Sequence, residues 1–178
     1  MNYVVFDLEC TCWEKNDPHK QFHETIEIGA VLLNKHFEVV NEFNKFVHPT
    51  YFPTLSNYCT TLTTIVQKDT DAAEGFENVF KYFLKWIENI NHKDLTLVSW
   101  GQFDIDQLRR DCDRNNVNFN LDKYVHINLK NVFAKTFKCK RCGLKKALSK
   151  SNILFEGIPH RGINDARMTS KLLKIVKS

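Results

Sequence analysis

Two carboxylates at the end of an apolar segment constrain this chain more than any other feature. Asp7 and Glu9 close the segment 3–9, which has the composition of a core strand. Alternate side chains of a strand share a face, so the two acids point one way while Val4, Phe6 and Leu8 fill the other face. Buried charges persist when they are paired or bind a metal, and no Lys or Arg occurs in the first fourteen residues. The pair therefore predicts a site for a hard divalent cation, Mg²⁺ or Mn²⁺.

Length and composition predict a single domain that spans residues 1–178. Of the 178 residues, 43% are hydrophobic, which suffices for one substantial core. The formal net charge of +4 is compatible with a nucleic-acid partner but is weak evidence for one. The chain has no apolar run of membrane-spanning length and no signal-peptide pattern at its start. We therefore expect no membrane partner and a cytoplasmic location, with the nucleus as the alternative in a eukaryote.

Six cysteines in a domain of this size favour reduced thiols in a reducing compartment. Cys139 and Cys142 have the spacing of half a zinc site, and Cys112, His126 or His160 would have to supply the remaining ligands. A structural zinc site is the alternative to ordinary thiols.

The hydrophobic pattern alternates between strand-like and helix-like periods, which predicts an α/β fold. Three strands precede any long helix, and residues 34–36 are predicted as a hairpin turn between the second and third strands. The predicted elements are strands 3–9, 25–33 and 37–47, a loop-rich stretch 49–71, an amphipathic helix 73–91, a strand 95–100, a helix whose buried stripe contains Ile105, Leu108 and Cys112, a short strand 124–127, and a final helix of about residues 163–176.

Two further acids follow the predicted elements at informative places. Asp104 lies just after a strand and near the start of a helix, and Asp165 lies near the start of the final helix. Taken singly, each is more often a helix cap or a first-turn acid. Together with Asp7 and Glu9 they form a candidate set of metal ligands.

These residues and their flanks resemble the DEDDh 3′→5′ exonucleases of the ribonuclease H-like fold. Asp7, Glu9, Asp104 and Asp165 occur in the family's order, and His160 precedes Asp165 by the five positions of the "h" form. The flanks resemble the Eri-type branch, which includes the histone-mRNA 3′ exonuclease. The segments that carry this resemblance are 6–13, 24–31, 62–67, 100–104 and 160–167.

The sequence departs from that branch at three flanking positions. Thr64 stands where the branch often has Gly, Gln102 where it often has Asp, and Phe103 where it often has Trp. No departure removes a catalytic group, and the departures bear on how the terminal nucleotide is held and therefore on the substrate preference.

The resemblance implies a fold and a reaction. The fold is a mixed five-stranded sheet, with its first three strands antiparallel, flanked by helices. The reaction is hydrolysis of RNA from its 3′ end with release of nucleoside 5′-monophosphates, assisted by two Mg²⁺ ions for which Mn²⁺ can substitute. Asp7 is expected to bridge both ions, Glu9 and Asp165 to hold the ion nearer the nucleophile, and Asp104 to contribute through water.

His160 is expected to act as the general base, with Glu9 as its catalytic companion. A histidine titrates near neutrality and so is able to accept a proton at pH 7. Taken alone, His160 would be an ordinary loop histidine before Gly162.

The resemblance also implies a pocket for the 3′-terminal nucleotide. The alternative is that Leu62, Ile65 and Phe103 are ordinary core residues. The expected nucleotide contacts are Glu9, the Cys10 backbone N–H, Leu62, Ile65, Phe103 as a stacking wall, and His160.

A basic cluster precedes His160, and it suits either phosphate contacts or a solvated helix face. The expected partner is the single-stranded 3′ end of RNA. Three alternatives stay open: a DNA-preferring DEDDh exonuclease, a non-catalytic RNA-binding or scaffold domain, and a zinc-stabilised interaction module. The cluster comprises Lys138, Lys140, Arg141, Lys145, Lys146, Lys150 and Arg161.

Overall fold

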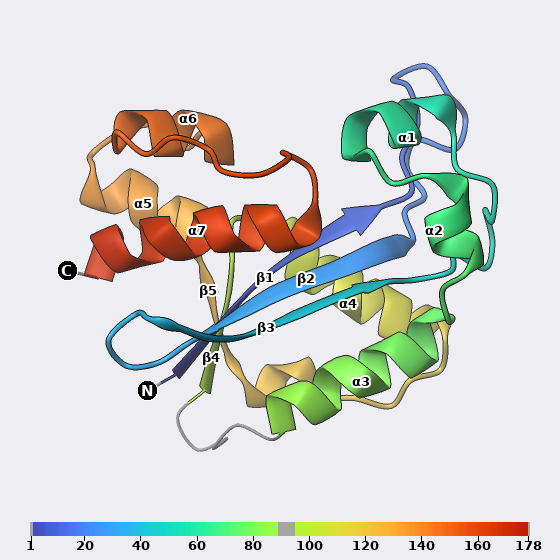
Figure 1. Cartoon of the computed structure of the whole chain (residues 1–178), viewed down its shortest axis with the longest axis horizontal. Helices are drawn as coiled ribbons and strands as arrows, with labels where there is room; N and C mark the ends of the chain where they lie inside the picture. The colour runs from blue at the N-terminus through green and yellow to red at the C-terminus, as the bar shows by residue number, and fades with distance from the viewer. Residues whose placement is uncertain (1, 89–94, 178) are drawn as a thin grey trace.

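A five-stranded mixed sheet forms the centre of the computed structural model, which describes residues 2–88 and 95–177 (Figure 1). Its strand order is β3-β2-β1-β4-β5, with β1, β2 and β3 antiparallel and β4 and β5 parallel to β1. This arrangement confirms the predicted fold class. The strands are β1 (Asn2–Cys10), β2 (Thr25–Leu33), β3 (Val39–Phe46), β4 (Leu95–Ser99) and β5 (Val125–Asn128).

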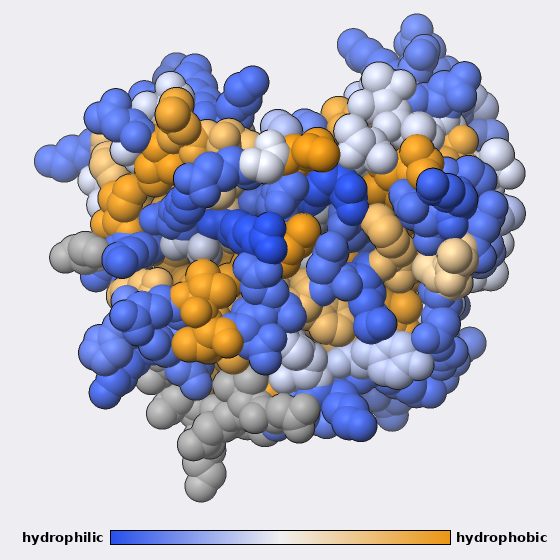
Figure 2. All heavy atoms as spheres, viewed as in Figure 1, coloured by the Kyte–Doolittle hydropathy of each residue, from blue (hydrophilic) through white to orange (hydrophobic). Residues whose placement is uncertain are grey.

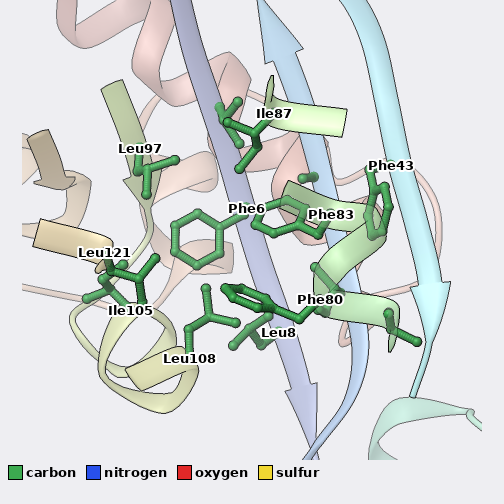
Figure 3. Packing of buried hydrophobic residues seen from close by; sticks show 14 of the residues in the cluster. Phe6, Leu8, Phe43, Phe80, Phe83, Ile87, Leu97, Ile105, Leu108 and Leu121 are labelled. Carbon is green, nitrogen blue, oxygen red and sulfur yellow. The ribbon is translucent and has the colours of Figure 1, made fainter. Parts of the chain in front are cut away.

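One face of the sheet is covered by α3 (Phe76–Glu88) and α4 (Phe103–Arg114). Val4, Phe6 and Leu8 of β1 point to this side and pack in one apolar cluster with the buried faces of both helices. Figure 3 shows Phe6 among the rings and aliphatic side chains of that cluster. The strand periodicity of residues 3–9 therefore directs its apolar set toward α3 and α4, as predicted.

The opposite face carries α5 (Leu129–Thr136), α6 (Leu144–Lys150) and α7 (Gly162–Lys177). Tyr3 and Val5 of β1 belong to a second apolar cluster with these helices. Asp7 and Glu9 follow in the same alternation, so β1 presents both acids on the α7 face of the sheet. The sequence did not predict α5.

Two short helices lie where a loop-rich stretch was predicted, so that prediction was wrong. They are α1 (Asn57–Thr63) and α2 (Gln67–Asp71). Each begins with a local side-chain bond: the Ser56 hydroxyl accepts the Cys59 N–H, and the Asp69 carboxylate accepts the Val66 N–H. Helices this short depend on such contacts more than on an apolar stripe, which is why periodicity missed them.

The other predicted boundaries agree with the structure to within a few residues. The helix predicted over 73–91 is observed as α3, and its last predicted residues, 89–91, fall outside the described residues. Among residues 2–88 and 95–177, no helix has the length and apolarity needed to cross a membrane.

Candidate active site

The carboxyl end of β1, the start of α4 and the start of α7 bring four acids together. Asp7 and Glu9 lie on β1, Asp104 lies in the first turn of α4, and Asp165 lies in the first turn of α7. The outline of the molecule in Figure 2 is notched above this region, between the α6 side and the α1 side. The acids that the sequence placed far apart therefore converge, as predicted.

A backbone hydrogen bond ties α4 to the strand that carries the first two acids. The Leu8 N–H donates to Asp104 Oδ1 at 3.2 Å, and Asp104 is 7% exposed. Leu8 lies between Asp7 and Glu9 in the chain, so this bond holds the third carboxylate beside the first two.

Glu9, His160 and Asp165 form the tightest part of the site. One potential ligand atom of each lies within 4.8 Å of those of the other two. His160 is exposed and has a φ of 60°, an uncommon value for a residue with a side chain. The Asp165 N–H donates to the Arg161 carbonyl at 2.9 Å, which sets α7 directly after that turn.

Burial of the carboxylates raises the pKa of all four acids, and the charges of neighbouring acids add to this for Asp7, Glu9 and Asp165. Burial, followed by the charges of Asp104, Glu9 and Asp165, holds the pKa of Asp7 well above its usual range. Burial and the Asp165 charge raise the pKa of Glu9 to about 9. Burial also raises the pKa of Asp104 to about 6, although the Leu8 N–H bond opposes it, and that of Asp165 to about 6. Four acids that repel one another in this way need positive charge among them.

The donor set fits a divalent cation. Asp165 Oδ1 is buried and has no hydrogen-bond partner in the part of the chain that the structure describes. A buried carboxylate oxygen without a partner is costly unless a cation supplies the missing interaction. Carboxylate oxygens are the ligands that hard divalent ions prefer, so the site is able to hold such an ion.

Glu27 is a site residue that the sequence reasoning missed. It is fully buried, and its Cα lies opposite that of Glu9 in the antiparallel register of β1 and β2. Its carboxylate accepts hydrogen bonds from Arg161 Nε at 3.1 Å and Nη2 at 3.0 Å, and from the Gly162 N–H at 2.9 Å. Glu27 thereby fixes the turn between His160 and α7. An acid inside the apolar run of β2 is the same signal that singled out Asp7, and it would have found Glu27.

Gly29 allows α7 to approach the sheet at the site. A Cβ on Gly29 would lie 2.0 Å from the Ile163 nitrogen and 2.1 Å from the Gly162 carbonyl carbon. No side chain fits there, so the glycine brings the start of α7, and Asp165 with it, against β2.

The predicted nucleotide contacts divide into open and closed positions. Phe103 is 44% exposed next to Asp104, and Leu62 is half-buried on α1. Ile65 is fully buried against Ile26, Leu55 and Cys59, so its predicted contact with a nucleotide is wrong for this structure. Its β-branched side chain fills the apolar space under α1.

The Cys10 backbone lies at an irregularity of the β1–β2 register, between Glu9 and Cys10. The Cys10 carbonyl oxygen accepts a hydrogen bond from the Cys59 thiol at 3.6 Å, and the Cys10 side chain is buried. A nucleotide contact of the Cys10 N–H stays a prediction.

Cys139 and Cys142 do not form a zinc site with other described residues. Both are half-buried and pack against the apolar cluster beneath α7. Across residues 2–88 and 95–177, Glu9, His160 and Asp165 form the one group of three or more ligand side chains close enough to share an ion. The zinc alternative therefore has no support from the structure.

Comparison with known proteins identifies the family of this chain. The family model described as "Exonuclease" matches residues 4–173. The chain belongs to the exonuclease family. That match includes all four acids and His160, and it confirms the predicted resemblance.

Named relatives place this exonuclease chain near the Eri-type enzymes. It is 31% identical to "3'-5' exonuclease Snipper" of Drosophila melanogaster over 97% of this chain and 68% of that protein. It is 29% identical to human "3'-5' exoribonuclease 1" over 94% of this chain and 50% of that protein. It is 30% identical to human "ERI1 exoribonuclease 2" over 95% of this chain and 27% of that protein. The chain thus spans half or less of the two human relatives.

Solved structures agree with the exonuclease assignment. The crystal structure titled as the nuclease domain of 3'hExo, "a DEDDh family member, bound to rAMP", matches with a TM-score of 0.90 and 27% identity over 99% of this chain and 91% of that chain. A structure titled "3'-end specific recognition of histone mRNA stem-loop by 3'-exonuclease" matches with a TM-score of 0.90 and 28% identity, covering 99% of this chain and 81% of that one.

Proposed function

We propose that this chain removes nucleotides one at a time from the 3′ end of single-stranded RNA and releases nucleoside 5′-monophosphates. The observation that carries the proposal is the convergence of Glu9, His160 and Asp165 within 4.8 Å, beside two further acids. A domain that only binds RNA has no use for four acids that repel phosphate unless cations accompany them.

The acids are the proposed ligands of two Mg²⁺ ions, for which Mn²⁺ would substitute. Asp7, Glu9, Asp104 and Asp165 would hold them, with the partnerless Oδ1 of Asp165 as one ligand atom. Such ions neutralise the phosphate and favour ionisation of the attacking water.

The chain's own groups would move the proton and hold the substrate. His160 is exposed at the rim of the acid cluster, where its imidazole would accept the proton of the attacking water. Glu9 would orient that water, and the open face of Phe103 would stack on the base of the terminal nucleotide.

The RNA preference rests on the names of the relatives. Human 3'-5' exoribonuclease 1 and the ERI1 exoribonucleases are named for action on RNA, whereas the Drosophila relative is named only as a 3'-5' exonuclease. A DNA-preferring exonuclease is therefore the alternative that the experiment must separate.

The test is a time course on matched 5′-labelled single-stranded RNA and DNA with Mg²⁺, with Mn²⁺ and with EDTA. We expect a ladder that shortens from the 3′ end of RNA, needs a divalent ion and is absent in Asp7→Ala. A ladder on DNA alone would reverse the sugar preference. A folded protein that cleaves neither substrate with either ion would overturn the proposal.

A further inference from the structure

A continuous row of six side-chain rings leads away from the acid cluster. It begins at Phe103, beside Asp104, and ends at Tyr51. We call these six side chains the aromatic row. Its successive ring centroids are 5.6 Å (Phe103–His23), 6.4 Å (His23–Trp13), 5.1 Å (Trp13–Phe52), 5.2 Å (Phe52–Phe22) and 5.5 Å (Phe22–Tyr51) apart.

Core packing does not account for the row. None of its rings belongs to the three apolar clusters that the described residues form. Its two ends are open to solvent, with Phe103 44% and Tyr51 55% exposed, and its four inner rings are half-buried. Contacting aromatic side chains that stay partly exposed mark a binding surface more often than a core.

Buried polar contacts hold the row in place at its outer end. The Glu24 carboxylate is 5% exposed and accepts the backbone N–H groups of Thr50, Tyr51 and Phe52 at 2.7 to 3.1 Å. A carboxylate used in this way fixes the backbone that carries Tyr51 and Phe52.

The inner part of the row is fixed from α4. The His23 carbonyl accepts hydrogen bonds from Gln107 Nε2 at 2.9 Å and from Arg114 Nη1 at 2.8 Å. Binding to a surface that is already ordered costs less conformational entropy, so this anchoring favours recognition.

Two arginine side chains of α4 lie over rings of the row, and Arg114 is also paired with the Asp111 carboxylate at 3.1 Å. The Arg110 guanidinium carbon lies 5.5 Å from the Phe103 ring centroid, and that of Arg114 lies 4.2 Å from the Phe22 centroid. Proteins that bind single-stranded nucleic acids combine aromatic side chains with cationic groups. The aromatic faces stack on the bases, and the cationic groups contact the phosphates.

Space for a flat ligand exists beside Trp13. A depression of about 480 Å³ lies between Trp13 and α1, with Asn16, Ser56 and Asn57 among its polar lining residues. Glu14 and Asp17 also line it and would repel a phosphate, so the depression suits a base and not the backbone.

We propose that the aromatic row is a platform for the bases of single-stranded nucleic acid upstream of the 3′-terminal nucleotide. The inference rests on the proposed function for its direction, because the terminal nucleotide at Phe103 defines where the strand begins. The platform predicts that affinity grows with the length of the strand until the row is occupied.

The experiment measures affinity by fluorescence anisotropy for a labelled dinucleotide and for a single strand of about ten nucleotides, in the Asp165→Asn background to prevent turnover. We expect Tyr51→Ala to weaken binding of the longer strand by about fivefold or more and to leave the dinucleotide unaffected, since each stacked base contributes measurably. Tyr82→Ala is the matched control, because Tyr82 is 41% exposed on α3 and lies outside the row. It should change neither affinity.

A second variant guards against a local effect of one substitution. Trp13→Leu should lower the affinity for the longer strand as Tyr51→Ala does. Thermal unfolding checks that this variant is folded. Equal affinities of both variants and the parent for the longer strand would overturn the platform, as would an affinity independent of strand length.

The two proposals fail separately. A protein without nuclease activity whose longer-strand binding still depends on Tyr51 would keep the platform and lose the proposed function. An active nuclease whose affinity for the longer strand is unchanged by Tyr51→Ala and Trp13→Leu would support the proposed function and contradict the platform.

Discussion

Two groups of acids in this molecule differ in the hydrogen-bond partners that the chain supplies to their carboxylates. At the end of β1, burial and mutual repulsion raise the pKa of Glu9 to about 9, and Asp165 Oδ1 has no described partner. At the start of β2, the Glu24 carboxylate accepts three backbone N–H groups, and Asp111 accepts from Thr25, Gln107 and Arg114.

The difference separates structural acids from functional ones. Glu24 and Asp111 have their hydrogen bonds supplied by the chain, and for Asp111 these bonds oppose the rise in pKa that burial causes. In the active-site group, Asp165 Oδ1 is buried without a described partner, which is costly to the free protein and suits a ligand of opposite charge. Glu27 combines both roles, because it is fully satisfied by Arg161 and Gly162 and thereby holds the incomplete group in place.

The sharpest test of the comparison is Asp165→Asn. Turnover should fall by about a thousandfold or more, because a metal ligand and its charge are lost, while the metal-free protein should unfold at the same or a higher temperature, because repulsion is relieved. Initial rates and thermal unfolding in EDTA measure the two effects. Asp113→Asn, at an exposed position of α4, should alter neither. A clear loss of stability would make Asp165 a structural acid.

His160→Ala should reduce turnover by about 10²- to 10⁴-fold with little change in stability, because the side chain is exposed and general-base assistance has this magnitude. Single-turnover rates at saturating substrate measure the chemical step. His36→Ala, at an exposed turn position, is the control. A variant that retains more than about a tenth of the parent's rate would contradict the assigned role.

Glu27→Gln tests the acid that has both roles. Loss of the charge leaves Arg161 without its partner, so the His160 turn should shift and turnover should fall by about 10- to 100-fold, with a higher metal concentration at half-maximal rate. If the pair acts as a unit, Glu27→Gln combined with Arg161→Gln should cost about as much as the single change. Additive losses would show that Glu27 acts independently of Arg161.

Glu24→Gln should act on stability first. Its carboxylate bonds are charge-assisted, so the free energy of unfolding should fall by about 1 to 3 kcal/mol in urea denaturation. Glu77→Gln, at an exposed position of α3, should change it by less than about 0.5 kcal/mol. Equal effects of the two changes would show that the buried hydrogen bonds of Glu24 do not stabilise the fold.

The pH dependence of the metal-free protein tests the raised pKa values directly. Folded-state pKa values of about 6 for Asp104 and Asp165 and about 9 for Glu9 exceed those of the unfolded chain, so the folded state binds more protons. Stability from these groups is present at low pH and is lost as pH rises through about 6 and then about 9. The unfolding temperature in EDTA should therefore fall between pH 5 and pH 8.5, and less steeply in Asp165→Asn. A rise over that range would contradict the shifts.

Local patterns recovered most of the sheet and part of the site. The strand predicted over 25–33 is β2 as observed, and the alternation in residues 3–9 put Asp7 and Glu9 on one face of β1. The same reasoning failed for α1 and α2, which depend on single capping bonds, and for Ile65, whose spacing from Leu62 says nothing about what covers it.

The sequence by itself determined which acids need a partner, because burying an unpaired Asp or Glu in a core segment costs free energy in any fold. Only the tertiary structure decided which partner each acid contacts. Glu27 finds Arg161 across 134 positions of sequence, and Leu8 finds Asp104 across 96. The aromatic row likewise joins segments that meet only in space, from residues 13–23, 51–52 and 103. Periodicity fixes the face on which a side chain lies, whereas its partners depend on how distant elements pack.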